Sequence, residues 1–348
     1  MKAVILAGGE GTRLRPLTEK RPKPLMPIAG RVCIDYVLDS LVSAGFNDII
    51  ITTAYLSEKL IKAIGSGAMH NANILYSFED TPAGTAGAVK KVSPYLDSTV
   101  IVASGDVLAD VNLAEIYEFH REKNADVTMA LTKVDNPTEF GIVGLDAENR
   151  IVRFLEKPKA EQVFSNLINA GIYILKKDVL DYVPSDRPFD FSKNLFPILL
   201  ENGYRLYGKV LSGIWLDVGR PMDLLSANLI MTEKKFAGKY IAPNVLLGEH
   251  ISMKEPVYIG GGVRVHTDVE INRACIYDGA FIDEKSKLTN ALVLHGARIG
   301  KNCHITHSIL SEKCVIEENA VIEESIIGEN VIIKRNSVLK NAIISGIA

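Results

Sequence analysis

The 348-residue sequence is poor in cysteine, in long apolar runs and in excess positive charge. Its four cysteines, at positions 33, 275, 303 and 314, form no CxxC pair, which argues against a disulfide framework or structural zinc and indicates a reducing, cytoplasmic environment. No window holds 18 consecutive apolar residues, so no membrane-spanning helix is expected. The apolar run from Ala3 to Ala7 is too short for the core of a signal peptide.

The formal net charge of −3 excludes a nucleic-acid-binding protein that relies on a global positive field, although it is compatible with a local basic pocket. Hydrophobic residues make up 47% of the chain and charged residues 23%, as in a globular and not a disordered protein. The length suffices for two domains of ordinary size.

Residues 1–235 alternate short apolar runs with segments of helical periodicity. The apolar runs KAVILA, DIIITTA, NILYSF and STVIVAS predict strands, whereas CIDYVLDSLVSAG, SEKLIKAIGS, GTAGAVKKV and NLAEIYEFHREK predict helices. This order predicts an α/β domain whose mostly parallel sheet is covered on both faces. Ligands bind such sheets at the carboxyl ends of the strands. The loops after KAVILA and STVIVAS are therefore expected to face one crevice.

Residues 236–348 show a different pattern, in which aliphatic residues recur every six positions. Four series carry the repeat: Ile259, Val265 and Ile271; Ile299 and Ile305; Ile316 and Ile322; and Ile327, Ile333 and Leu339. The register slips by one residue in places, as between positions 322 and 327. Such periodicity predicts a parallel β-helix, whereas a β-sandwich would not repeat its turn residues so regularly. We expect Cys275, Cys303 and Cys314 to fill its core, and its flat faces to support a homo-oligomer.

The most unusual stretch of the chain is LAGGEGTRLRPLTEKRPKP, residues 6–24. It is not a P-loop, because no Lys-Ser/Thr pair follows Gly11, and it is not a dinucleotide loop, because Leu14 replaces the third glycine. Glycine loops nevertheless expose backbone N–H groups that bind anions, and Arg13 offers a bidentate grip. Lys23 stands on a stiff segment between two prolines. We interpret the stretch as an anion-binding loop; the alternative is a solvated basic loop.

With its continuation LMPI, this stretch resembles the signature of the sugar-1-phosphate nucleotidyltransferases. The resemblance continues in chain order through PAGTAGAV (82–89), SGD (104–106), FG (140–141), EKP (156–158), NAGIYI (169–174) and WLDVG (215–219). Val32 departs from the pattern, since many relatives have proline there, but it lies outside the phosphate loop. The resemblance implies a Rossmann-like nucleotidyltransferase domain followed by a left-handed parallel β-helix.

The resemblance also implies a set of site residues. The nucleotide would be bound by Gly8, Gly9, Gly11, Thr12, Arg13, Pro82, Gly84 and Thr85; the sugar phosphate by Gly141, Glu156, Lys157 and Asn169; and magnesium by Asp106 and Asp217. Arg13, Lys23 and Lys157 would have catalytic roles. Simpler interpretations remain open: Asp106 as a turn former, Asp217 as a helix cap, Glu156 and Lys157 as a surface charge pair, and Trp215 as a packing residue.

The implied reaction joins an NTP to a sugar 1-phosphate and releases pyrophosphate, with Mg²⁺ as cofactor. The segment GTAGAV looks most like that of the mannose-1-phosphate guanylyltransferases, which favours GTP and mannose 1-phosphate; glucose 1-phosphate with UTP or dTTP is the alternative. Because the attacking phosphate oxygen is already ionised, catalysis requires positioning and charge screening. Two other hypotheses are an acetyltransferase β-helix that uses His295, His304 or His307, and a non-catalytic regulatory paralogue. A paralogue of that kind would be expected to lack one of Arg13, Lys23, Asp106 or Asp217, and all four are present.

Overall fold

The computed structural model describes residues 2–346, which pack as two compact units. The first unit consists of residues 2–9 and 33–216, and the second of residues 10–32 and 217–346. This division by packing differs from the division at residue 235 expected along the chain. The segment of residues 10–32, called the basic loop below, and the helix at 221–236 share a unit with the C-terminal repeats.

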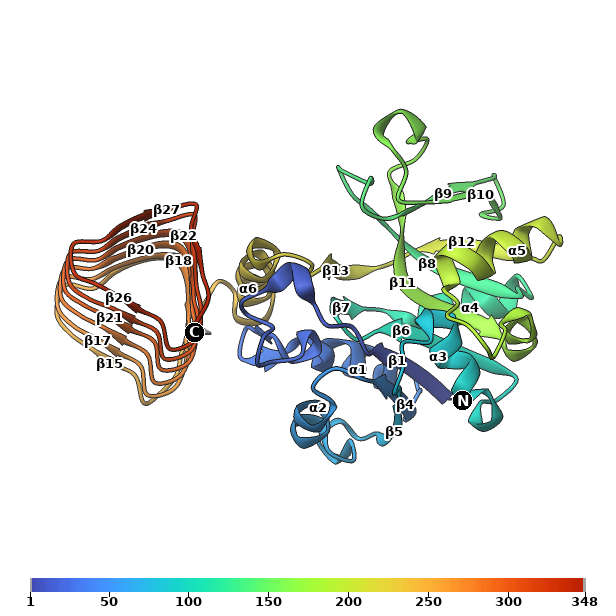
Figure 1. The fold of residues 1–348 in the computed structure, drawn as a ribbon, viewed down its shortest axis with the longest axis horizontal. Coiled ribbons are helices and arrows are strands. Elements are labelled where there is room, and N and C mark those ends of the chain that lie inside the picture. The colour runs from blue at the N-terminus through green and yellow to red at the C-terminus, as the bar shows by residue number, and fades with distance from the viewer. Residues whose placement is uncertain (1, 347–348) are drawn as a thin grey trace. The chain divides into compact units, whose positions relative to one another are not determined.

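The centre of the first unit is a nine-stranded mixed sheet, with the main order β10-β9-β11-β6-β1-β4-β5 (Figure 1). β1 (Lys2–Ala7) pairs in parallel with β4 (Asp48–Thr53) and β6 (Thr99–Ser104), and β5 (Asn73–Phe78) extends this parallel half. β11 (Leu167–Lys176) runs antiparallel to β6. The remaining strands of this sheet are β8 (Val127–Lys133), β9 (Gly141–Leu145), β10 (Ile151–Glu156) and β12 (Leu206–Val210). β7 (Val107–Val111) and β13 (Gly213–Asp217) form a separate two-stranded sheet. The predicted α/β fold is confirmed.

Helices cover the sheet because its strands are apolar on both faces. Val4, Val100 and Val102 pack with Ala86 and Val89 in one buried cluster, while the alternate residues of the same strands are buried on the other face. A parallel sheet buried in this way reads as continuous apolar runs, as the sequence does here. The helices are α1 (Cys33–Ser43), α2 (Ser57–Ile64), α3 (Gly84–Val92), α4 (Leu113–Glu122) and α5 (Phe196–Glu201).

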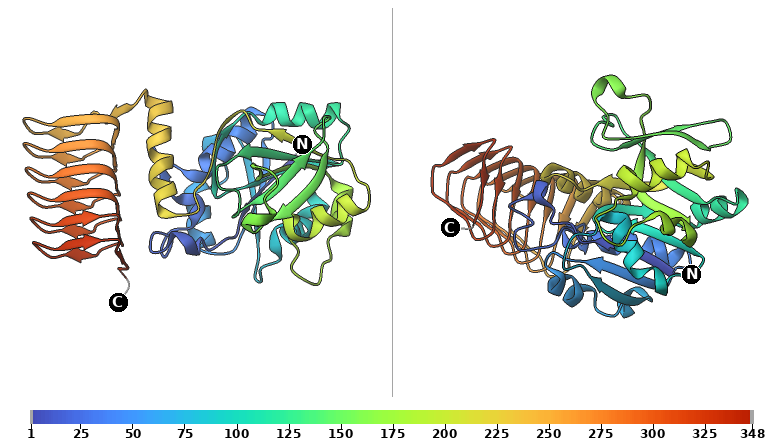
Figure 2. Two further views of the ribbon diagram at one scale, coloured as in Figure 1. Left: turned by 90° about the horizontal axis from the view of Figure 1, so that it is seen from above. Right: turned by 45° about the vertical axis from the view of Figure 1, so that its right-hand side comes forward.

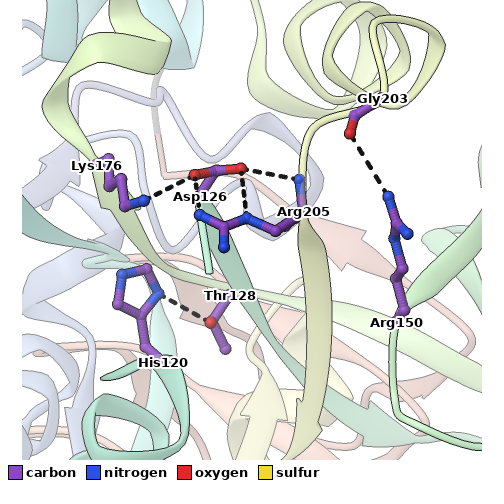
Figure 3. A network of polar contacts seen from close by, with 7 residues as sticks. All are labelled: His120, Asp126, Thr128, Arg150, Lys176, Gly203 and Arg205. Carbon is purple, nitrogen blue, oxygen red and sulfur yellow. Dashed lines mark hydrogen bonds and ion pairs between the residues drawn. The ribbon is translucent and has the colours of Figure 1, made fainter. Parts of the chain in front are cut away.

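A partly buried polar network, drawn in Figure 3, lies where β11 ends beside the first residue of β6, since Lys176 pairs with Thr99. The carboxylate of Asp126 accepts hydrogen bonds from Lys176 Nζ at 2.9 Å and from the backbone N–H of Arg205 at 2.9 Å. Burial opposes ionisation of Asp126, but hydrogen bonds from the Arg205 guanidinium, from Lys176 and from the Arg205 backbone outweigh it and lower its pKa to about 2. Nearby, Nδ1 of His120 lies 2.9 Å from the hydroxyl of Thr128. The network joins α4, β8, β11 and the start of β12, so it stabilises the fold.

The second unit is dominated by a parallel β-helix, seen as stacked coils in Figures 1 and 2. One sheet contains β14 (Lys239–Ile241), β16 (Ser252–Ile259), β18 (Glu270–Ile276), β20 (Lys287–Val293), β22 (His304–Leu310), β24 (Val321–Glu323), β25 (Ile326–Ile327), β27 (Val338–Lys340) and β28 (Ile343–Ile344). The other contains β15 (Leu246–Leu247), β17 (Arg264–Val265), β19 (Phe281–Ile282), β21 (Arg298–Ile299), β23 (Val315–Ile316) and β26 (Ile332–Ile333). Every pairing given for these strands is parallel.

The repeat of the β-helix is a coil of 17 residues over most of its length, because stacked partners such as Ile282, Ile299 and Ile316 are 17 positions apart. Core residues therefore follow steps of five, six and six, as in Ile271, Ile276, Ile282 and Leu288. The slip seen in the sequence between 322 and 327 is one of these regular five-residue steps. Asparagines at left-handed corners stack along the coils, with Asn302, Asn319 and Asn336 joined by 3.2 Å hydrogen bonds.

All four cysteines are free and buried. Cys303 and Cys314 belong to the core of the β-helix, as predicted. Cys275 is also buried, but it lies outside that core cluster and packs against Thr232 of α6. The one long helix of this unit that the structure describes is α6 (Pro221–Phe236). Nowhere in residues 2–346 is a helix both long and apolar enough to cross a membrane.

Candidate active site

The carboxyl ends of β1 and β6 bring two of the predicted loops to one edge of the first unit's sheet. Leu6 pairs with Ser104, and the N–H of Gly105 donates to the carbonyl oxygen of Leu6 at 2.9 Å. A Cβ at Gly105 would lie 2.7 Å from Cγ2 of Ile5, so only glycine allows this close approach. The half-buried Asp106 follows directly, in the turn before β7. The SGD loop and the Gly8–Gly9 loop therefore emerge side by side, as the topology predicted.

The PAGTAGAV segment forms the start of α3 and is fixed by the backbone of Phe189. The N–H groups of Ala86 and Gly87 donate to its carbonyl oxygen at 2.9 and 3.0 Å. Gly84 has a φ of +75°, and a Cβ there would lie 2.6 Å from the same oxygen. Glycine is required at 84 because both the backbone conformation and the contact exclude a side chain. Pro82 precedes this turn and is exposed.

Thr85 is held by a residue that the sequence did not single out. Its backbone N–H and its hydroxyl both donate to Oδ1 of Asp190, at 3.1 and 3.2 Å. The same hydroxyl accepts a hydrogen bond from the N–H of Phe191 at 3.0 Å. Since these bonds are internal to the fold, the Thr85 hydroxyl positions α3, and its predicted role in nucleotide binding stays a prediction.

Three predicted sugar-binding residues lie close together in the first unit. A Cβ at Gly141 would lie 2.6 Å from Oε2 of Glu156, so this glycine provides the room that the carboxylate occupies. Asn169 sits at a bulge in β11 and accepts a hydrogen bond from the N–H of Gly171 at 2.9 Å. Its amide nitrogen donates to Oη of Tyr173 at 2.9 Å and to Oγ of Ser192 at 3.0 Å. These three hydrogen bonds, to Gly171, Tyr173 and Ser192, orient the Asn169 side chain.

Burial raises the pKa of the Glu156 carboxyl group above its ordinary value. The positive charges of Lys157 and Lys193 partly offset this by lowering the same pKa. Ser192 also hydrogen-bonds this carboxylate, so one hydroxyl serves both Glu156 and Asn169. Lys157 itself is exposed, with a φ of +47° and its N–H donating to the carbonyl oxygen of Phe140 at 2.9 Å. Glu156 is thus partly buried and held within the fold, whereas the neighbouring Lys157 is exposed.

Ser192, Asp190 and Tyr173 complete this part of the site and were missed from the sequence. The segment FDFSKN (189–194) carries a weak signal, since Asp190 and Ser192 alternate with two buried phenylalanines. Trp215 packs as expected: its Nε1 donates to the carbonyl oxygen of Ala170 at 2.9 Å, and its ring meets Phe140 edge-on.

In the second unit, the basic loop brings Lys23 and Arg13 to the carboxylate of Asp217. Nζ of Lys23 lies 3.3 Å from Oδ1, and Nη2 of Arg13 lies 3.5 Å from Oδ2. The Lys23 side chain is only 7% exposed, whereas that of Arg13 is 53% exposed. Thr12 and Arg13 belong to a short 3-10 helix, η1 (Thr12–Leu14). Two cations thus flank one carboxylate.

Two glycines allow this arrangement. Gly11 has a φ of +63°, and a Cβ there would lie 3.1 Å from Cβ of Lys23. A Cβ at Gly219 would lie 2.7 Å from Oδ2 of Asp217 and 3.1 Å from Nη2 of Arg13. A side chain at Gly11 or Gly219 would crowd these charged residues, so the close approach of the backbone requires glycine at both positions.

Asp217 does not cap the helix that follows it, which excludes the simpler interpretation of this residue. α6 begins at Pro221, and its first turn is capped by Asp223, whose Oδ2 accepts the N–H of Arg220 at 2.7 Å. Carboxylates such as Asp106 and Asp217 are the hard oxygen ligands that Mg²⁺ prefers, with phosphates and water completing the shell. The one group of three protein donors found within residues 2–346, at His266, Asp283 and Glu284, lies elsewhere, on the β-helix.

Residues 2–234 match the model of the nucleotidyl transferase family. The chain belongs to this family. Residues 237–339 of the transferase match a second model, the LbH domain of EIF2B subunit epsilon. The predicted pairing of a nucleotidyltransferase segment with a left-handed β-helix segment is therefore confirmed.

Curated relatives of the transferase carry two kinds of name. It is 34% identical to a UTP–glucose-1-phosphate uridylyltransferase of Synechocystis sp. over 78% of this chain and 76% of that one. It is 36% identical to a mannose-1-phosphate guanylyltransferase of Mycobacterium tuberculosis, over 80% and 79% of the two chains. For a mannose-1-phosphate guanyltransferase of Aspergillus oryzae, the identity is 37% over 79% and 74%.

A solved structure supports the same family. A Bacillus anthracis protein named as a glucose-1-phosphate thymidylyltransferase, in complex with a sucrose, superposes with a TM-score of 0.60 at 26% identity. The match covers 66% of this chain and 94% of that one. The predicted class of enzyme, a sugar-1-phosphate nucleotidyltransferase, is thus confirmed, while the names of the relatives divide over the sugar and the nucleotide.

Proposed function

We propose that the transferase joins GTP to mannose 1-phosphate, giving GDP-mannose and pyrophosphate. The proposal rests on one observation: Lys23 and Arg13, on the glycine-rich loop, both contact the carboxylate of Asp217. This arrangement combines two cations with a carboxylate able to hold Mg²⁺. The choice of GTP and mannose 1-phosphate rests on the GTAGAV segment and on relatives named for that reaction. Glucose 1-phosphate with UTP or dTTP is the second candidate, because other relatives are named for those substrates.

The residues take the following roles in this proposal. The nucleotide is bound by the backbone of Gly8, Gly9 and Gly11, by Thr12 and Arg13, and by the segment of Pro82, Gly84 and Thr85. Glu156 and Asn169 hydrogen-bond the sugar hydroxyls beside Gly141, and Lys157 contacts the sugar phosphate. The hydroxyl of Ser192 holds Glu156 and Asn169 in place.

The chemistry needs no general base. An ionised oxygen of the sugar phosphate attacks the α-phosphorus of the NTP, so that a new P–O bond forms and the bond to the β-phosphate breaks, with pyrophosphate leaving. Mg²⁺ held by Asp106 and Asp217 would supply charge neutralisation for the phosphates. Lys23 and Arg13 screen the negative charges that otherwise keep two polyanions apart, and Lys157 does the same for the sugar phosphate.

The test is a pyrophosphate-release assay on the whole chain. GTP, ATP, UTP, CTP and dTTP are each combined with mannose, glucose, glucosamine and N-acetylglucosamine 1-phosphates, with and without Mg²⁺. We expect the highest kcat/KM for GTP with mannose 1-phosphate, and loss of turnover when Mg²⁺ is chelated. A clear preference for glucose 1-phosphate with UTP or dTTP would select the second candidate. No turnover with any pair would contradict the enzymatic proposal, and an acetyl-CoA arm tests the acetyltransferase hypothesis.

A further inference from the structure

The basic loop is anchored on the β-helix by three consecutive residues. Nη2 of Arg21 lies 2.7 Å from Oε1 of Glu312, Nζ of Lys20 lies 3.6 Å from Oε2 of Glu329, and the hydroxyl of Ser345 donates to Glu19 at 3.1 Å. Their partners are spaced by 17 and 16 positions, about one coil each, so residues 19–21 run along the stack and contact three successive coils.

A second anchor holds the other end of the loop. The fully buried Asn228 of α6 accepts the N–H of Ala29 at 3.0 Å and donates to the carbonyl oxygen of Pro27 at 2.9 Å. Oη of Tyr277, from the β-helix, donates to the same Asn228 oxygen at 2.6 Å. Gly30 lies against the ring of Tyr258, since a Cβ there would be 2.5 Å from its Oη. These contacts hold residues 27–30 against α6 and the β-helix.

Lys23 lies between the two anchors, in the short 3-10 helix η2 (Lys23–Leu25). One residue, Pro22, separates it from Arg21. Because proline fixes its own φ angle, the backbone between Arg21 and Lys23 has less rotational freedom, which couples the position of Lys23 to that of Arg21. The Arg21–Glu312 pair is also better protected from solvent than the Arg15–Glu10 pair of the same loop. Its side chains are 28% and 21% exposed, against 50% and 60% for Arg15 and Glu10.

We propose that Arg21 and Glu312 are positioning residues, through which the β-helix holds Lys23 in its reactive place. The inference rests on the proposed function of Lys23. Arg15 pairs within its own loop, whereas Lys20 and Arg21 tie the loop to the coils. A short ion pair with limited exposure holds its partners more firmly than one in solvent.

The kinetic test compares the substitutions Arg21→Gln and Glu312→Gln with two matched controls. Arg15→Gln removes an exposed pair from the same loop, and Glu284→Gln removes an exposed ladder pair with Lys301 from the same β-helix. We expect kcat to fall roughly tenfold in the first two variants because Lys23 is misplaced, with KM for the sugar phosphate changed by less than about twofold. The controls should behave as the wild type. Equal kcat values in Glu312→Gln and Glu284→Gln would overturn the proposal.

A charge exchange and a proteolysis assay keep the test independent of folding and of activity. Arg21→Glu alone should impair kcat, and adding Glu312→Arg should restore most of it; a double variant no better than the single one counts against the pair. Trypsin is expected to cut Glu312→Gln faster than Glu284→Gln after Arg13 and Lys20, since proline follows Arg15, Arg21 and Lys23. Unchanged cleavage would overturn the anchoring even if the wild type proved inactive in every pyrophosphate assay, so the two failures are distinguishable.

Discussion

The stability of the first unit should depend on pH through the buried His120. Its side chain is on α4, and the residue is 4% exposed. Burial, assisted by the charge of Lys176 and opposed by that of Asp126, lowers its pKa from 6.5 to about 4. On unfolding, the ring regains its ordinary pKa and takes up a proton that the folded state refuses. Stability is therefore complete above pH 6.5 and falls as the pH drops toward 4.

The size of this effect follows from the shift. The full loss corresponds to about 3 kcal/mol, and about 2 kcal/mol of it falls between pH 7.5 and pH 5. The substitution His120→Gln removes the titration while its amide can still bond the Thr128 hydroxyl. We expect the wild type to lose about 2 kcal/mol more than this variant over that interval.

The measurement is urea unfolding at both pH values, followed by the fluorescence of the single tryptophan. Trp215 lies in the first unit, where its Nε1 binds the carbonyl oxygen of Ala170, so it reports on the unit that contains His120. The exposed His304, replaced by Gln, serves as the control and should leave the wild-type pH dependence unchanged. If wild type and His120→Gln lose the same stability between the two pH values, the reasoning is wrong.

Three further outcomes are expected. Lys23→Ala and Asp106→Ala should each reduce turnover by at least roughly 100-fold, because each removes a preorganised charge; circular dichroism should show the wild-type fold, and near wild-type rates would refute the assigned roles. Gly84→Ala should destabilise the first unit by about 1–3 kcal/mol, from its positive φ and its contact with Phe189, measured by urea unfolding, and an unchanged midpoint would contradict this. Ellman's reagent should label none of the four buried thiols in the native protein and all of them in urea, since burial raises the pKa of Cys275 and Cys314 to about 12; rapid native labelling would contradict their assignment as core residues.

The sequence predicted the β-helix well because its repeat is local. Each coil places its core aliphatics by steps along the chain, so the pattern is readable without knowing any long-range contact. What the sequence left as an irregular slip is a regular step of five residues in each 17-residue coil, as from Ile271 to Ile276 and from Ile322 to Ile327. Only the stacked register shows that the shorter step recurs at stacked positions in successive 17-residue coils.

The sequence singled out the candidate residues that would contact a ligand, but not the residues that hold them in position. Glycine loops at strand ends, Glu156 and Asn169 carry local signatures. Ser192 and Asp190 do not, because their partners Asn169 and Thr85 lie 23 and 105 positions away along the chain. Their positions follow from how Phe191 and Phe196 pack into the core with Tyr173.

By itself, the sequence determined the order of strands and helices and the roughly six-residue periodicity of the β-helix, because these depend on neighbours within a few residues. Tertiary structure decided which charges meet. Lys23 reaches Asp217 across 194 positions, and Arg21 reaches Glu312 across nearly the whole chain. Pairings of this kind depend on the packing of distant segments, and among the many lysines, arginines and carboxylates of the chain no local pattern distinguishes the partners that packing selects.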